Sequence, residues 1–266
     1  MRKMALLAAV AALAVLPALG AAAQTTEGQV IVVHGVPDLE VDVYVNGDLT
    51  LEGFQFGEVA GPLDLPEGTY DVEIYAAGAD PSADDPALSG SAELPAGAAA
   101  TIAAYLQEGG DPTLGVFVED NSQMAAGDAR VTARHLADFG PVDVLADGSA
   151  VFSGVANGEG GDADVPAGTY GIQITAAGDP DTVAFDADVD LAEGTNTLAY
   201  AIGSVSGGSF QVATAALSGL GSAPDGVPTG TAGLAAATPM WTVVILAALA
   251  AVAMSGGAVA LARSRR

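Results

Sequence analysis

The chain has 266 residues and no cysteine, and its 33 Asp and Glu against seven Lys and Arg give a formal net charge of −26 at pH 7. The absence of cysteine excludes a disulfide scaffold, Fe–S ligation, zinc–thiolate sites and cysteine nucleophiles. The shortage of cations argues against nucleic-acid binding, which needs clustered Lys and Arg to displace counterions from phosphates. Because 50% of the residues are nevertheless hydrophobic, we expect the acidic and the apolar residues to occupy different segments.

The N-terminal segment, residues 1–23, is predicted to be a secretory signal peptide. Arg2 and Lys3 form a cationic start, and an apolar stretch follows over residues 5–16. Small residues precede the predicted cleavage point between Ala23 and Gln24. The alternative is an uncleaved signal anchor, for which this apolar run is short.

At the other end, residues 240–262 are almost entirely apolar, and at about 1.5 Å per residue this run is long enough to cross a bilayer as a helix. The basic tail at 263–266 marks the cytoplasmic side. Residues 218–239, rich in Gly, Pro and Ala, are predicted to be a flexible stalk. We therefore expect a single-pass protein of the cell membrane that contacts the lipid bilayer through 240–262. Its N-terminal domains would be extracellular and its C-terminus cytoplasmic.

A second interpretation of the C-terminus remains open. The sequence VPTG at 227–230 lies upstream of the apolar run and basic tail, as in a sortase sorting signal, although one residue of the L-P-x-T-G pattern is missing. The segment between the two ends carries all 33 acidic residues and only two cations, Arg130 and Arg134. Two alternatives explain this acidity, either a saline habitat or a composition bias.

The exported part is predicted to consist of two tandem copies of one domain, residues 24–120 and 129–217. Several motifs recur about 100 residues apart: the two histidines, the VDV triplets at 41–43 and 142–144, and the related GTY segments at 66–78 and 166–178. A repeat of this length is a domain and not a solenoid unit of 20–50 residues.

Each copy is predicted to be all-β. Alternate valines at 41–45 have the period of two that is typical of a half-buried strand, and Asn46-Gly47 predicts a hairpin turn. The GTY segment alternates in the same way, and further strands fit 88–94, 99–106 and 114–119. Gly and Pro recur at the spacing of a sandwich, roughly every 8–12 residues. The fold class is therefore two tandem antiparallel β-sandwiches.

The segments VHGVPDLEVDVYVNG at 33–47 and FGEVAGPLDLPEGTYDVEIYAAG at 56–78 resemble the start of a DUF4397 domain. The first copy matches the family pattern nearly throughout 30–119. The second copy keeps the histidine and the AGTY segment, but Ala137 replaces the proline of the Pro-Asp pair and Leu145 replaces a tyrosine. The resemblance implies an extracellular prokaryotic module with an immunoglobulin- or transthyretin-like sandwich, and it implies no known activity.

Six polar or aromatic side chains recur at equivalent positions and are interpreted as structural: His34, His135, Asp42, Asp143, Tyr70 and Tyr170. The alternative for the histidines is a metal ligand or general base beside a carboxylate. One histidine per domain is too few for a typical zinc site, so the structural interpretation is preferred.

Acidic loops offer further, weak candidates for a metal site, through Asp80, Asp84 and Asp85 in the first copy and Asp179 and Asp181 in the second. Hard oxygen ligands of this kind suit calcium. Neither loop has the EF-hand or RTX pattern, so a solvated surface is the preferred interpretation. No cofactor is expected, and calcium is the one weak alternative.

No motif for catalysis accompanies these residues, because the sequence has neither a G-x-S-x-G elbow nor a phosphate loop. We expect a non-enzymatic, membrane-anchored surface protein with a structural or adhesive role, binding envelope polysaccharide or other surface proteins. The alternatives are an extracellular ligand- or calcium-binding module and an unrecognised extracellular hydrolase.

Overall fold

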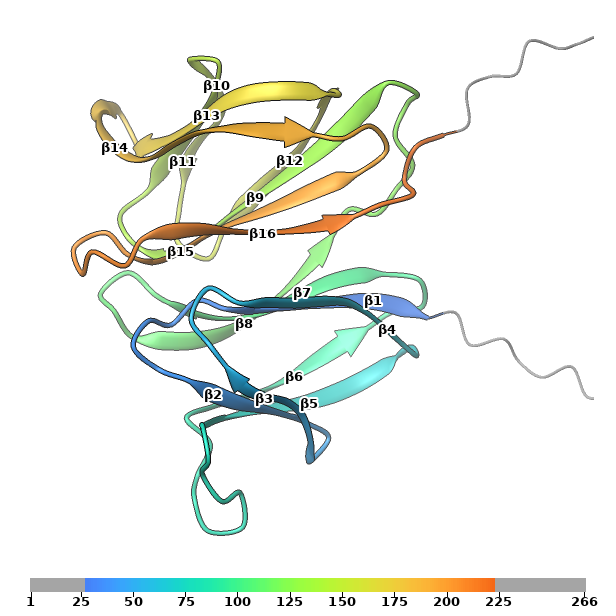
Figure 1. The fold of residues 1–266 in the computed structure, drawn as a ribbon, viewed down its shortest axis with the longest axis vertical. Coiled ribbons are helices and arrows are strands. Elements are labelled where there is room, and N and C mark those ends of the chain that lie inside the picture. The colour runs from blue at the N-terminus through green and yellow to red at the C-terminus, as the bar shows by residue number, and fades with distance from the viewer. Residues whose placement is uncertain (1–26, 223–266) are drawn as a thin grey trace, which may run out of the picture. The chain divides into compact units, whose positions relative to one another are not determined.

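The protein is described by a computed structural model that covers residues 27–222. These residues form sixteen β-strands in four four-stranded sheets, which confirms the predicted all-β, sandwich-like fold (Figure 1). The strands at Val41–Val45, Leu88–Leu94 and Ala99–Leu106 have the predicted bounds.

The first sandwich, β1–β8, has two sheets. Its inner sheet has the order β4-β1-β7-β8, and its outer sheet has the order β3-β2-β5-β6. The bounds are β1 Gly28–His34, β2 Val41–Val45, β3 Asp48–Phe54, β4 Val59–Leu65, β5 Gly68–Ala76, β6 Leu88–Leu94, β7 Ala99–Leu106 and β8 Pro112–Glu119.

The second sandwich, β9–β16, repeats this arrangement. Its inner sheet has the order β12-β9-β15-β16 and its outer sheet the order β11-β10-β13-β14. The bounds are β9 Asp128–Asp138, β10 Val142–Ala146, β11 Ser149–Val155, β12 Gly160–Pro166, β13 Gly168–Ala176, β14 Asp179–Leu191, β15 Asn196–Ser204 and β16 Gln211–Leu217.

The predicted hairpin turn lies between β2 and β3. Asn46 and Gly47 both have positive φ, at 52° and 83°, and their counterparts Asp147 and Gly148 have 49° and 75°. This is the conformation of a two-residue turn that matches the twist of the flanking strands.

The prediction of purely antiparallel sheets is wrong at one place in each sandwich. In the inner sheets β1 pairs with β7, and β9 with β15, in parallel. Parallel neighbours require a long crossover instead of a hairpin. Here the chain supplies it by building the outer sheet between the two paired strands.

The two inner sheets face each other across a shared apolar core. Ile31, Val33 and Ala103 of the first sandwich pack there against Leu198 and Ile202 of the second. All eight residues of β7 are buried, because one face of this strand lines its own sandwich and the other face lines the shared core. A strand covered on both faces is a continuous apolar run, which explains the AATIAAYL sequence of β7.

The fold is self-contained within residues 27–222, since all the strand pairings above and the three apolar cores lie inside this range. None of these residues forms a helix capable of spanning a bilayer. The predicted signal peptide with its Ala23–Gln24 cleavage point, the segment 240–262 and the basic tail lie outside the described residues. Of the predicted stalk only 218–222 are described, and there Leu220 donates to the carbonyl of Gly194 and Ser222 to that of Met124.

Candidate functional site

The recurring aspartates each hold two turns of the outer sheet. The two carboxylate oxygens of Asp42 accept hydrogen bonds from the backbone N–H groups of Gly53, at 2.8 Å, and Gly78, at 2.9 Å. Asp143 accepts from Gly154 and Gly178 at the same two distances. These backbone donors lower the pKa of Asp143, because they stabilise the ionised carboxylate.

The recurring tyrosines fasten the start of the GTY strand. The hydroxyl of Tyr70 donates to the carbonyl of Pro66 at 2.6 Å, and Tyr170 donates to Pro166 at 2.8 Å. A tyrosine that bonds to backbone a few residues upstream is a known corner device of β-sandwiches. Both hydroxyls therefore have a local structural partner.

The two histidines are buried inside their sandwiches, with exposed fractions of 1% for His34 and 2% for His135. Nε2 of His34 lies 2.8 Å from the carbonyl oxygen of Leu39, and Nε2 of His135 lies 3.0 Å from that of Gly140. A carbonyl only accepts, so Nε2 carries the proton and the buried Nδ1, which has no partner in either ring, is a bare acceptor. Burial lowers the pKa of both histidines, since the charged ring would lose its hydration.

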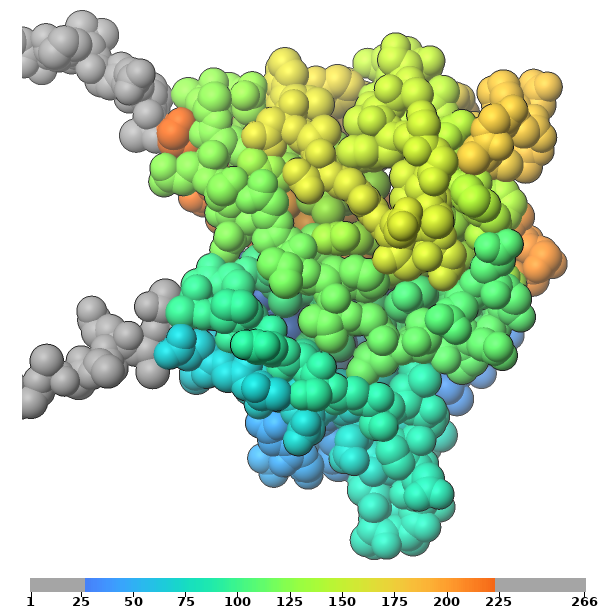
Figure 2. All heavy atoms as spheres, turned by 180° about the vertical axis from the view of Figure 1, so that it is seen from behind, coloured from blue at the N-terminus to red at the C-terminus, as the bar shows by residue number. Residues whose placement is uncertain are grey.

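The acidic loops use their carboxylates to stabilise their own turns. Asp80 accepts from the backbone N–H and the hydroxyl of Ser82, which lowers its pKa, and Asp84 accepts from the N–H of Asp80. In the second copy Asp179 accepts from the N–H of Asp181 and the hydroxyl of Thr182. The first loop, residues 77–87 with Asp85, projects from its sandwich (Figure 2). Within residues 27–222 no three His, Asp or Glu side chains are grouped to hold a metal ion.

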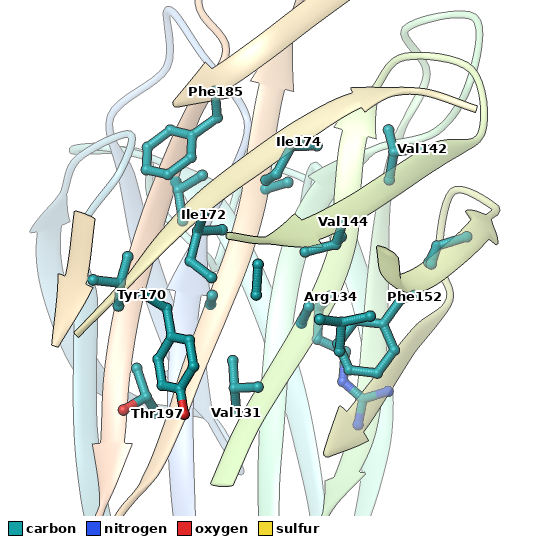
Figure 3. A pocket seen from close by; sticks show the side chains of 18 of the residues that line it. Val131, Arg134, Val142, Val144, Phe152, Tyr170, Ile172, Ile174, Phe185 and Thr197 are labelled. Atoms are coloured by element: carbon teal, nitrogen blue, oxygen red, sulfur yellow. The ribbon is translucent and has the colours of Figure 1, made fainter. Parts of the chain in front are cut away.

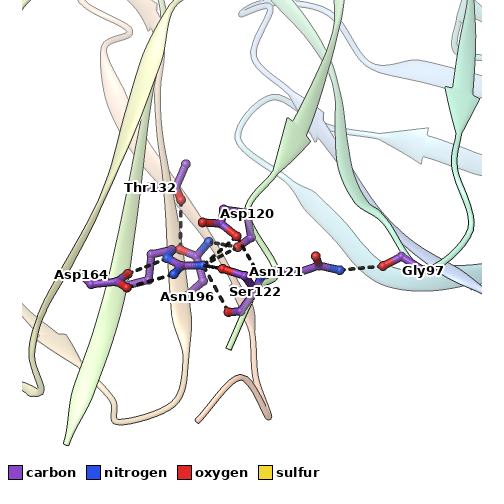
Figure 4. Close-up of polar contacts among 8 residues, drawn as sticks. Gly97, Asp120, Asn121, Ser122, Thr132, Asp164 and Asn196 are labelled. Atoms are coloured by element: carbon purple, nitrogen blue, oxygen red, sulfur yellow. Dashed lines mark hydrogen bonds and ion pairs between the residues drawn. The ribbon is translucent and has the colours of Figure 1, made fainter. Parts of the chain in front are cut away.

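A buried arginine fixes the segment that joins the two sandwiches (Figure 4). Arg130, on β9, has 4% of its side chain exposed and forms two bonds to Asp164, at 2.6 and 3.0 Å. Its third nitrogen lies 3.0 Å from a carboxylate oxygen of Asp120 and 3.1 Å from the carbonyl of the same residue. From the joining segment, Asn121 also donates to the carbonyl of Gly97 in the first sandwich.

A second arginine pairs across the junction. Arg134 lies 2.7 Å from Glu119, whose side chain is 0% exposed, and its guanidinium stacks over Phe117 at 5.1 Å from the ring centroid. Nearby, the hydroxyls of Thr101 and Tyr200 lie 2.7 Å apart, and burial raises the pKa of Tyr200. The two cations of residues 27–222, Arg130 and Arg134, thus both contact the junction between the sandwiches.

Sequence reasoning missed this junction, although a signal was present. Arg130, Thr132 and Arg134 are alternate residues of β9, so they lie on one face of that strand. The rest of this segment has no Lys or Arg. Two arginines on one face of a strand therefore indicate that acidic partners are buried against that face. The sequence predicts two tandem domains, and it does not predict that this face of β9 contacts the first domain.

An apolar cavity of about 130 Å³ lies between the sheets of the second sandwich (Figure 3). Figure 3 shows Phe152 and Phe185 at opposite sides of it, with Tyr170 and Thr197 toward one end. The remaining walls are mainly aliphatic: Val131, Ala133, Val142, Val144, Val165, Ile172, Ile174, Ala199 and Val212. The first sandwich has a cavity of about 210 Å³ between its own sheets, with Asp48, Thr50 and Glu93 among the lining residues.

Comparison with known proteins agrees with the resemblance seen in the sequence. The family model described as "Domain of unknown function (DUF4397)" matches residues 28–144. This range covers the whole first sandwich, all of β9 and the first three residues of β10. The chain therefore resembles the DUF4397 family over that range. None of the curated proteins compared with the chain matches it.

Proposed function

We propose that this is a membrane-anchored protein of the cell surface that displays its two sandwiches as one rigid, non-enzymatic body for adhesion or envelope binding. The observation that supports this most directly is the shared core between the inner sheets, reinforced by the buried Arg130 and Arg134 pairs. A body joined in this way keeps a fixed spacing between its two outer surfaces. The export signal at 1–23 and the apolar segment 240–262 supply the location in this proposal.

The recurring polar residues support a structural role and not catalysis. The aspartates, tyrosines and Nε2 of both histidines are bonded to backbone within their own sandwich. A catalytic group must instead face a substrate with free hydrogen-bonding capacity. The proposed contacts with envelope polysaccharide or surface proteins are therefore made by exposed loops, such as residues 77–87.

Of the two sandwich types that the sequence suggested, we propose the transthyretin-like one. In an immunoglobulin domain the first, second, fourth and fifth strands share a sheet. Here the first strand shares its sheet with the fourth, seventh and eighth, in both copies. This strand distribution differs from the immunoglobulin order.

Limited proteolysis of intact cells tests the display. We expect protease added outside the cells to release a resistant fragment that contains residues 27–222 and ends soon after Ser222. This fragment, purified, should bind envelope polysaccharide or whole cells. Retention of the fragment until the cells are lysed would contradict surface display, and a released fragment that binds neither target would contradict adhesion.

A further inference from the structure

Three side chains that face the interior of the second sandwich are more exposed than their counterparts in the first, although the first sandwich has the larger cavity. Val30, Val72 and Ala92 of the first sandwich are 3%, 3% and 4% exposed. Their partners by strand register in the second sandwich, Val131, Ile172 and Val189, are only half-buried. Apolar side chains that point between two sheets and still touch solvent line an accessible cavity.

The walls of the two cavities differ at several equivalent positions. By register, Val32 of β1 corresponds to Ala133 of β9, and Ile102 of β7 corresponds to Ala199 of β15. At one position of the outer sheet the second sandwich has the larger side chain, because Phe152 corresponds to Leu51 of the first. The first sandwich, with Val32 and Ile102, has a cavity of about 210 Å³ with Asp48 and Glu93 in its lining, whereas no carboxylate lines the cavity of the second.

The lining of this cavity selects an uncharged, apolar ligand. The Tyr170 hydroxyl and Nε2 of His135 already bond to backbone carbonyls, and the Arg134 guanidinium is paired with Glu119 on the far side of β9. The walls are otherwise mainly Val, Ala, Ile and Phe. The buried polar atoms without a partner on these lining residues are Nδ1 of His135 and Nε of Arg134, so the walls offer a ligand mainly apolar contacts.

The volume sets the size of the ligand. A cavity of about 150 Å³ lined by Leu, Ile and Phe is dry and takes up benzene. At about 130 Å³, the cavity of the second sandwich suits an apolar group of comparable size. We propose that it is a binding site for the end of a linear alkyl chain, with any polar head left in solvent. This inference does not depend on the proposed surface display.

Calorimetric titration of residues 27–222 with n-alkanols from butanol to octanol tests the site. We expect saturable binding that strengthens about fourfold for each added methylene until the cavity is full. Ala199→Ile, which introduces the side chain that the first sandwich has at Ile102, should weaken octanol binding at least tenfold. Ala150→Ile makes the same change at an exposed position of β11 outside the cavity and should leave binding unchanged.

Two further variants locate the binding. Cooperative unfolding shows that the Ala199→Ile variant is folded. If it does not unfold cooperatively, Ala133→Val is used as the cavity-filling variant instead, since the first sandwich has Val32 at that position. Ala100→Ile narrows the cavity of the first sandwich and should leave octanol binding intact. Absence of saturable binding, equal affinity in the cavity-filling variant, or loss of binding only in Ala100→Ile would overturn the proposal.

Discussion

The two sandwiches have one strand order and one set of turn-fixing residues, but their interiors differ. The first buries eleven residues in its core, whereas the core of the second contains four fully buried residues, with the rest only partly covered. Asp42 and Asp143 make equivalent hydrogen bonds to backbone in the two sandwiches, and so do Tyr70 and Tyr170. The two sandwiches therefore keep the same backbone-fixing bonds while the packing of their cores differs.

The largest effect is expected at the junction on which both sandwiches depend. Arg134→Met leaves the fully buried Glu119 without its partner, and removing one member of a buried ion pair costs about 3–5 kcal/mol. Chemical denaturation of residues 27–222 should show this loss in one cooperative transition. The double variant Glu119→Gln, Arg134→Met should recover most of it. A transition that splits into two, with one half unaffected, would show that the sandwiches fold independently.

A matched pair of substitutions compares the two interiors. Val30→Ala removes two methyl groups from a side chain that is 3% exposed, at a cost of about 2 kcal/mol. Val131→Ala makes the same change at the equivalent, half-buried position and should cost about half as much, because less apolar surface returns to water. Urea melts of both variants measure the difference. Equal losses would mean that the second interior is as closed as the first.

Acidification should weaken both sandwiches through their histidines. The pKa of each folded histidine lies below 6.5, so as the pH falls below about 6.5 the unfolded chain takes up the proton first. Stability is therefore complete above that pH and declines below it, by up to about 1.4 kcal/mol per pH unit for each histidine. His34→Gln and His135→Gln should each reduce the slope between pH 6.5 and 5.5, by at most one proton. An unchanged slope in either variant would contradict the assignment of a neutral ring.

The smallest effect concerns the acidic loops. Since Asp80 and Asp179 are bonded within their own turns and no metal cluster occurs in residues 27–222, the melting temperature in Ca²⁺ should equal that in Mg²⁺ at the same ionic strength. Differential scanning calorimetry makes this measurement. A rise specific to Ca²⁺ that disappears in Asp80→Asn or Asp179→Asn would restore the calcium-binding alternative.

Much of the fold could be predicted from the sequence because it depends on local patterns. Alternating valines, the Asn46-Gly47 turn and the repeated GTY segment each specify structure over a few residues. The assignment of the recurring Asp, Tyr and His residues to the scaffold rested on their repetition alone. In the structure each of these side chains bonds to the backbone of its own sandwich.

The junction and the cavity could not be predicted, because both depend on contacts between distant residues. Arg134 and Glu119 are 15 residues apart and meet only when the inner sheets face each other. The walls of the second cavity likewise bring together Ala133 and Ala199, which are neighbours only through the parallel pairing of β9 and β15. Neither substitution toward alanine stands out in a sequence so rich in alanine.

Hydrogen exchange on residues 27–222, followed strand by strand, tests the central claim most directly. The account predicts the slowest exchange in β1, β7, β9 and β15, which meet at the shared core, because exchange there requires both sandwiches to open. It also predicts faster exchange in the outer strands β10 and β13 of the second sandwich than in their counterparts β2 and β5. Equal protection of these two pairs, or slower exchange in the second sandwich, would contradict it.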